Sequence, residues 1–177
     1  DFQATLETKP EKAIKLEKDA LAQIENITAD NARLVSNLHA NLGGLYRMNG
    51  HPDLAREHME KSISLLDQFN LLHINDSIPQ IANYAMFLTE QQEPERGISE
   101  LQKLSGIIKE YHSDHCLDYA KVQETLGTIY LMTANLPQAK TYFKKAFKIY
   151  EKIWADEPEM IEAKYREIQE LYPQIGF

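Results

Sequence analysis

The sequence predicts an all-helical protein built as a stack of antiparallel helical hairpins. Apolar residues recur at intervals of three and four, as at Leu38, Leu42 and Leu45, which is the period of a helix with one buried face. No segment shows the alternation of apolar and polar residues that is typical of strands. Small residues recur in addition at a fixed long interval, which indicates that one structural unit is repeated.

The repeated unit is 42 residues long. Gly43 and Gly127 are 84 residues apart, and each is preceded by Leu and followed three residues later by Tyr. Ala85 lies midway between them. Three further columns share this register, and they hold Ala55, Gly97 and Ala139; Met59, Leu101 and Phe143; and Ser62, Leu104 and Ala146. Four columns in phase favour a repeat over an ordinary bundle with two incidental glycines.

Each copy is expected to form two helices in close contact. In the first copy, Asn49-Gly50-His51-Pro52 ends one helix and begins the next, because Gly favours a helix C-terminus and Pro favours a first helical turn. Similar punctuation recurs at Pro94 and Pro137. Small residues permit the axes of two helices to approach. The predicted close pairs are Gly43 with Ala55, Ala85 with Gly97, and Gly127 with Ala139.

These motifs resemble the tetratricopeptide repeat, and in particular its longer-helix variety in kinesin light chains. The resemblance rests on Asn-Leu-Gly-Gly-Leu-Tyr at 41–46 and on Ala-x-x-Tyr-Phe-Lys-Lys-Ala-Phe-Lys-Ile-Tyr-Glu-Lys at 139–152. The usual period is about 34 residues. The resemblance implies one domain over 1–177, a right-handed superhelical stack of hairpins. Its expected parts are a partial repeat at 8–27 with a second helix from Pro10 to Ala20, repeats at 30–72, 73–113 and 114–156, and a capping helix at 157–173.

The same resemblance implies a protein- or peptide-binding scaffold, because in this family the first helices of the hairpins line a concave groove that binds peptides. Asn41 and Asn83 match the family's asparagine before Leu, whereas Thr125 replaces it in the third copy. A side-chain amide donates and accepts, so such residues can hold the backbone of an extended peptide; an asparagine merely tolerated on an exposed helix face is the open alternative. The expected groove residues are Asn37, Asn41, Gly44, Met48, Asn83, Met86, Glu90, Lys121, Glu124 and Thr128.

Composition narrows the class of partner and the compartment. The net charge is −8, from 27 acidic and 19 basic residues, which disfavours nucleic acid and suits a neutral or basic peptide. No apolar run approaches the roughly 18 residues of a membrane span. A single cysteine, Cys116, indicates a reducing compartment and hence the cytoplasm. The one basic strip is expected to be a solvated outer face, and it consists of Lys140, Lys144, Lys145, Lys148 and Lys152.

The sequence predicts no enzyme, no metal site and no cofactor. The cluster His112-Ser113-Asp114-His115-Cys116 contains ligand types for zinc and a potential nucleophile. It falls, however, between the second and third copies, where we expect a turn with Asp114 capping the next helix. No second ligand cluster completes a closed site, and no acid, base and nucleophile converge.

An alternative function is that of a sensor segment of a larger bacterial transcription regulator or peptide-pheromone receptor. A helix-turn-helix elsewhere in such a protein would distinguish it. The chain starts Asp1-Phe2-Gln3 without an initiator Met, so we expect a segment of a longer protein. Other domains of that parent are a further candidate partner.

Overall fold

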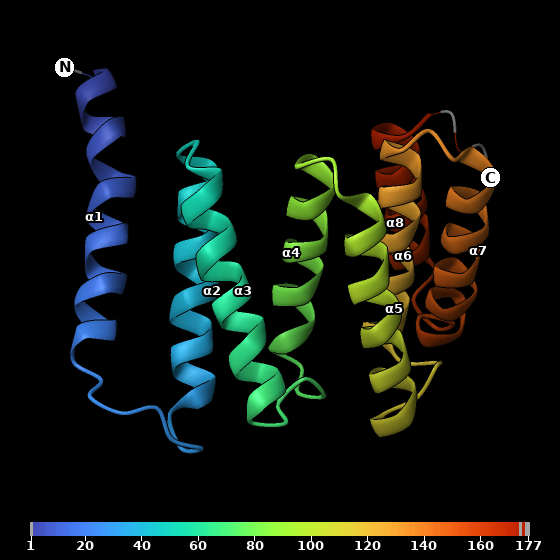
Figure 1. Ribbon diagram of the computed structural model, residues 1–177. Helices are drawn as coiled ribbons and strands as arrows, with labels where there is room; N and C mark the ends of the chain where they lie inside the picture. The colour runs from blue at the N-terminus through green and yellow to red at the C-terminus, as the bar shows by residue number, and fades with distance from the viewer. Residues whose placement is uncertain (1, 174, 176–177) are drawn as a thin grey trace. The chain divides into compact units, whose positions relative to one another are not determined.

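The described part of the structure, a computed structural model, comprises residues 2–173 and 175. These residues form eight α-helices and no strand (Figure 1). The helices are α1 (Phe2–Ala22), α2 (Ala32–Met48), α3 (Pro52–Gln68), α4 (Ser77–Glu90), α5 (Pro94–Tyr111), α6 (Leu117–Met132), α7 (Leu136–Ile153) and α8 (Pro158–Leu171). The chain divides into two compact units, Asp1–Tyr84 and Ala85–Phe177, so the boundary falls within α4.

The centre of the first unit is the antiparallel hairpin of α2 and α3 (Figure 1). Leu42 of α2 and Leu66 of α3 are fully buried. A Cβ atom on Gly43 would lie 2.6 Å from Met59 Cγ and 3.3 Å from the Ala55 carbonyl oxygen. The predicted close approach of Gly43 and Ala55 is therefore confirmed, since there is no room for a larger residue between the two axes.

The second unit contains the other two predicted glycine contacts. A Cβ atom on Gly97 would lie 2.6 Å from the carbonyl oxygen of Ala85, so this pair is confirmed. At Gly127 the nearest atoms belong to the ring of Phe143, at 3.0 Å, and not to the expected Ala139. Phe143 lies one helical turn after Ala139, and its large ring fills the space beside the glycine.

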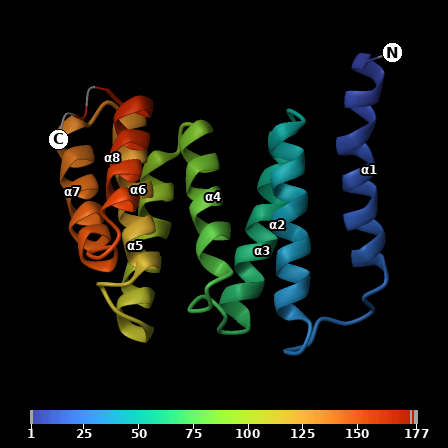
Figure 2. The same cartoon turned by 180° about the vertical axis from the view of Figure 1, so that it is seen from behind.

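The last helix completes the second unit. Figure 2 shows α8 beside α6 and α7. Its Tyr165 ring stacks on Phe147 of α7 with centroids 4.0 Å apart, and its Ile168 is buried. Aromatic stacking and burial of this kind cover the apolar face that a final hairpin would otherwise expose.

The first helix of each hairpin ends in the same way in all three copies. Gly50, Gln92 and Ala134 have φ values of 73°, 64° and 59°, in the left-handed region. The amide of the following residue in each case reaches back to the carbonyl five residues earlier, as His51 does to Tyr46 at 2.9 Å. This is a Schellman motif. The three left-handed residues are 42 residues apart, so the backbone repeats the predicted period even where the side chain changes.

Two local predictions are wrong. The first helix does not begin at Pro10 but at Phe2, and Pro10 lies inside it. A proline removes one backbone donor, and α1 continues through that loss. Asp114 does not cap α6, because the N-cap residue is Cys116, whose sulfur accepts from the amide of Tyr119 at 3.5 Å. The Asp114 carboxylate contacts Lys109 and His115 instead.

Candidate functional site

The candidate site is a pocket of about 590 Å³ in the first unit. Residues of α2 and of the first half of α4 form most of its lining, and α3 contributes two more. Four of the lining side chains are amides. The complete lining is Asn37, Ala40, Asn41, Gly44, Arg47, Met48, Met59, Ser62, Asp76, Pro79, Gln80 and Asn83.

Helical spacing brings the α2 side of the pocket together. Asn37, Asn41, Gly44 and Met48 follow one another at intervals of three and four residues, so they share one face of α2. Small residues on this face leave the pocket open. A Cβ atom added to Gly44 would meet no atom within 4 Å. On α4, Gln80 and Asn83 are three residues apart and share a face for the same reason.

A polar cluster fixes one wall of the pocket. The Gln80 side-chain oxygen accepts hydrogen bonds from Ser36 and Ser62, at 2.9 and 2.5 Å. Its amide nitrogen donates to Asn37 Oδ1 at 2.6 Å. Both serines are buried, so these bonds satisfy hydroxyl groups that would be costly to leave unpaired. The cluster therefore holds the Asn37 amide in one orientation, with its nitrogen left to donate.

The other two asparagines differ in what they bind. Asn41 donates from Nδ2 to Glu17 Oε1 of α1 at 3.0 Å. The second carboxylate oxygen of Glu17 is buried and has no hydrogen-bond partner among the described residues. Asn83 is exposed, and in the described part of the chain its side chain makes no hydrogen bond. Of the three asparagines, Asn83 has its whole amide available to a ligand.

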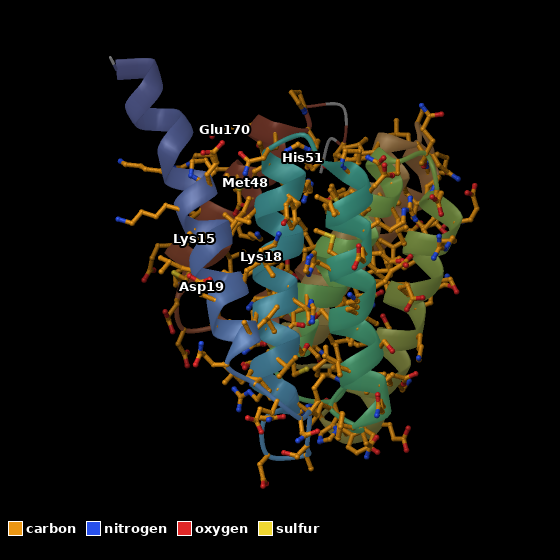
Figure 3. The ribbon with its side chains drawn as sticks, turned by 60° about the vertical axis from the view of Figure 1, so that its left-hand side comes forward. Lys15, Lys18, Asp19, Met48, His51 and Glu170 are labelled. Carbon is orange, nitrogen blue, oxygen red and sulfur yellow. The ribbon has the colours of Figure 1, made fainter. Side chains whose placement is uncertain are left out.

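The rim of the pocket combines an apolar side chain with charges. Met48 is 84% exposed at the end of α2, near His51 at the start of α3 (Figure 3). On α4's side, the Asp76 carboxylate pairs with Arg33 at 2.5 Å. An exposed methionine at a pocket rim is a flexible apolar contact for a ligand.

The pocket gathers half of the predicted groove residues. Asn37, Asn41, Gly44, Met48 and Asn83 line it. The other five belong to the second unit and do not line it. Met86 is half-buried and Glu90 is exposed, both on the last part of α4, while Lys121, Glu124 and Thr128 lie on α6.

On α6 the predicted residues bind other parts of the chain. Glu124 accepts a hydrogen bond from Tyr150 Oη at 2.6 Å and pairs with Lys164 of α8 at 2.8 Å. The Thr128 hydroxyl donates to the backbone carbonyl of Glu124 at 3.1 Å, and Lys121 lies 3.9 Å from Asp118. The carboxylate of Glu124, one of the predicted groove residues, is thus already neutralised by a lysine of the same unit.

The Glu124 cluster perturbs the acidity of its partners. Burial raises the pKa of the Tyr150 phenol, and the neighbouring Glu124 charge adds to that shift. For Lys164, burial opposes the charged form, but hydrogen bonds with Glu124 and Glu167 outweigh it, so the pKa of the ammonium group is raised. Lys164 therefore remains charged and Tyr150 protonated at neutral pH, which keeps the cluster intact.

The sequence did not predict Ser36, Gln80 or Arg47 as site residues, and it marked Ser62 only as a small residue of the repeat. Gln80 could have been predicted, because its helical spacing places it on the same face as Asn83. The serine contacts depend on how α3 packs on α2, which no local pattern reports.

Within residues 2–173 and 175, no three His, Cys, Asp or Glu side chains gather closely enough to hold a metal ion. Across the same residues, no helix combines the length and apolar character needed to cross a membrane. His39 and His58 do contact each other, with their Nδ1 atoms 2.8 Å apart. Burial lowers the pKa of His39 to about 4, and the proximity of His58 adds to this effect.

The fold places the chain among the all-α helical-repeat proteins, which confirms the predicted fold class. Residues 77–152 match the family model described as tetratricopeptide repeat. This segment therefore contains tetratricopeptide repeats, as the motifs of the chain suggested. Repeats of this family generally mediate interactions between proteins. No curated protein sequence matches the chain.

Several solved structures are similar to it in fold. BtubC (BKLC) from P. vanneervenii has a TM-score of 0.71 at 20% identity, over 84% of this chain and 58% of that one. TPR-like repeats of a Podosopora anserina protein described as a kinesin light chain give 0.70 at 14% identity, over 83% of this chain and 70% of that one. A point variant of those repeats gives 0.72 at 13% identity. The chain thus spans 58% of the length of BtubC.

Proposed function

We propose that the chain is a non-catalytic protein-binding module that holds an extended peptide in the pocket of α2 and α4. The observation that carries this proposal is the lining of that pocket, where four side-chain amides from two successive first helices surround about 590 Å³. Amides can satisfy both the donors and the acceptors of a peptide backbone without selecting its side chains. The proposed cytoplasmic location rests on the single cysteine.

The side chains around the amides suggest what the peptide carries. Met48 is 84% exposed, so an apolar side chain of the ligand would remove apolar surface from water by packing on it. The net charge of −8 favours a neutral or basic peptide. A basic side chain that reaches Asn41 would also approach the Glu17 carboxylate, which accepts a hydrogen bond from Asn41.

The test begins with peptides selected on the wild-type chain from a displayed random library. Titration of Asn83→Ala should then show about two- to tenfold weaker binding, because a lost hydrogen bond costs about 0.5–1.5 kcal/mol. Met48→Ser should weaken binding as well, and its exposure makes damage to the fold small. The control is Lys144→Ala on α7, which should leave the affinity unchanged. The proposal is wrong if the Lys144 variant loses binding while the two pocket variants keep it.

Substitutions of Asn41 and Asn83 should differ in their effect on the fold. Asn41→Ala removes a side-chain amide that would bind the peptide and also removes the hydrogen bond between α2 and Glu17. It should therefore weaken binding and also increase hydrogen exchange in α1. Asn83→Ala should affect binding alone, since its side chain makes no hydrogen bond in the described structure. Equal exchange in α1 for both variants would contradict this assignment.

A further inference from the structure

The exposed face of α7 carries an unusual concentration of one charge. We name Lys140, Lys144, Lys145, Lys148 and Lys152 the lysine strip. Lys144, Lys145, Lys148 and Lys152 are exposed and Lys140 is half-buried. The opposite face of α7 is buried, with Phe143 and Tyr150 in the core of the second unit. The strip therefore faces solvent for three helical turns.

The lysine strip has no carboxylate partner in the part of the chain that the structure describes. Among the described residues, none of its five ammonium groups takes part in an ion pair. The Nζ atom of Lys145 lies over the Tyr142 ring, 4.7 Å from the ring centroid. Two lysines of other helices do have a carboxylate partner. Lys61 pairs with Glu57 and Lys109 with Asp114.

The one acidic residue of α7 does not bind the strip. Glu151 accepts a hydrogen bond from Tyr165 Oη of α8 at 2.9 Å. Its charge raises the pKa of that phenol, after the larger effect of burial. Glu151 is thus turned toward α8, and the field of the lysines remains largely uncompensated.

The spacing of the strip disfavours the helix that carries it. Lys140, Lys144, Lys148 and Lys152 follow one another at intervals of four residues, and like charges at this interval repel one another along a helix. They form a row about 18 Å long. A chain with 27 acidic residues could have balanced this row with i,i+4 partners, as it does at Lys61. A row that remains unbalanced at a cost to the helix suits a ligand that supplies the missing carboxylates.

From these observations we infer that the lysine strip docks a short acidic segment of a partner protein, at a surface separate from the pocket of α2 and α4. A short segment rich in Asp and Glu contacts the strip alone. A long polyanion such as duplex DNA, or an anionic membrane, would also meet the field of the whole chain, whose net charge is −8. The chemistry that fits is therefore a run of carboxylates as long as the row.

The test uses fluorescein-labelled hexaglutamate as the probe and hexaglutamine as the uncharged comparison, titrated against the whole chain. Hexaglutamate should bind with an affinity that falls as salt is added, because exposed charges are screened beyond about 8 Å at physiological ionic strength. Hexaglutamine should not bind. The double variant Lys144→Gln with Lys148→Gln should bind the acidic probe about three- to tenfold more weakly. The matched control is Lys61→Gln with Lys109→Gln, which removes the same charge outside the strip and should change affinity less than twofold.

A gain of affinity provides a second readout that misfolding cannot mimic. Glu151→Gln removes the single negative charge of α7 and should tighten hexaglutamate binding about two- to threefold. The inference is overturned if hexaglutamate does not bind, or if the two double variants weaken binding equally, since a general charge effect would then explain it. It is also overturned if duplex DNA or phosphatidylserine vesicles bind through these lysines while hexaglutamate does not.

Discussion

A single methyl group on Gly97 should reveal how closely α4 and α5 approach. In Gly97→Ala the new Cβ atom would lie 2.6 Å from the carbonyl oxygen of Ala85 and 3.3 Å from its Cα. These are backbone atoms, so no side chain can rotate away and α5 must shift. Gly106 on the same helix provides a matched control, because a Cβ atom there would meet nothing within 4 Å.

The expected magnitudes follow from two opposing terms. Replacing a helical glycine by alanine gains about 1 kcal/mol in helix propensity, and Gly106→Ala should receive this gain alone. Gly97→Ala should receive the same gain and lose about 1–3 kcal/mol to overpacking. The difference between the two variants is therefore the overpacking cost. For a chain of this size it corresponds to melting temperatures roughly 2–12 °C apart.

Thermal unfolding followed by far-UV circular dichroism measures this difference, and urea unfolding provides a second estimate. Gly106→Ala should melt above the wild-type chain, and Gly97→Ala should melt below Gly106→Ala. Equal melting temperatures for the two variants would mean that the second unit accommodates a methyl group at Gly97 freely. The repeat would then not require a small residue at this crossing.

Three further predictions concern other positions. Gly127→Leu should destabilise the second unit by about 1–3 kcal/mol, because the new side chain meets the Phe143 ring; an unchanged melting temperature would contradict this packing. Ala134→Gly should be neutral or stabilising, because φ at Ala134 is 59° and glycine tolerates this angle better than alanine. Most Ala→Gly changes in helices cost about 1 kcal/mol, and a loss of that size in urea unfolding would exclude backbone strain at Ala134. Folding lowers the pKa of His39 from 6.5 to about 4, so the unfolded chain binds a proton more readily and stability should fall as pH drops from 6.5 towards 4, by at most about 1.4 kcal/mol per pH unit. Unfolding of wild-type and His39→Gln chains across this range should show the extra slope in the wild type, and parallel curves would mean that His39 does not titrate as described.

The sequence predicted the hairpins because their cause is visible in it. Gly43 and Gly97 occupy crossings where a Cβ atom would require its neighbours to shift, and a requirement of that kind leaves small residues at a constant interval. The left-handed residues that end the first helices repeat at the same interval, but their amino-acid types differ from copy to copy. Only Gly50 is suited to its left-handed backbone, because it has no Cβ atom, whereas Gln92 and Ala134 adopt the same conformation against their intrinsic preference. A propensity argument finds the first of these turns and misses the other two.

The candidate site likewise contains residues that the sequence could predict and others that it could not. Residues that share one helix face, such as Asn37 and Asn41, could be grouped by spacing alone, and they line one pocket. The equivalent face of α6 could not be judged in this way. Glu124 binds Lys164, a residue of a helix 40 positions further along the chain. Contacts of this kind depend on how the last helix packs, so the local sequence contains no sign of them.

The central proposal, that an extended peptide binds in the pocket of α2 and α4, is tested most directly by the methionine methyl groups. The chain has five methionines, and two of them, Met48 and Met59, line the pocket. A chain labelled with ¹³C-methyl methionine is titrated with a selected peptide and followed by NMR. If the peptide binds in this pocket, the Met48 and Met59 signals should shift together with the binding curve, while those of Met132 and Met160 stay in place. Shifts at Met132 or Met160 with unchanged Met48 and Met59 signals would place the ligand elsewhere and contradict the proposal.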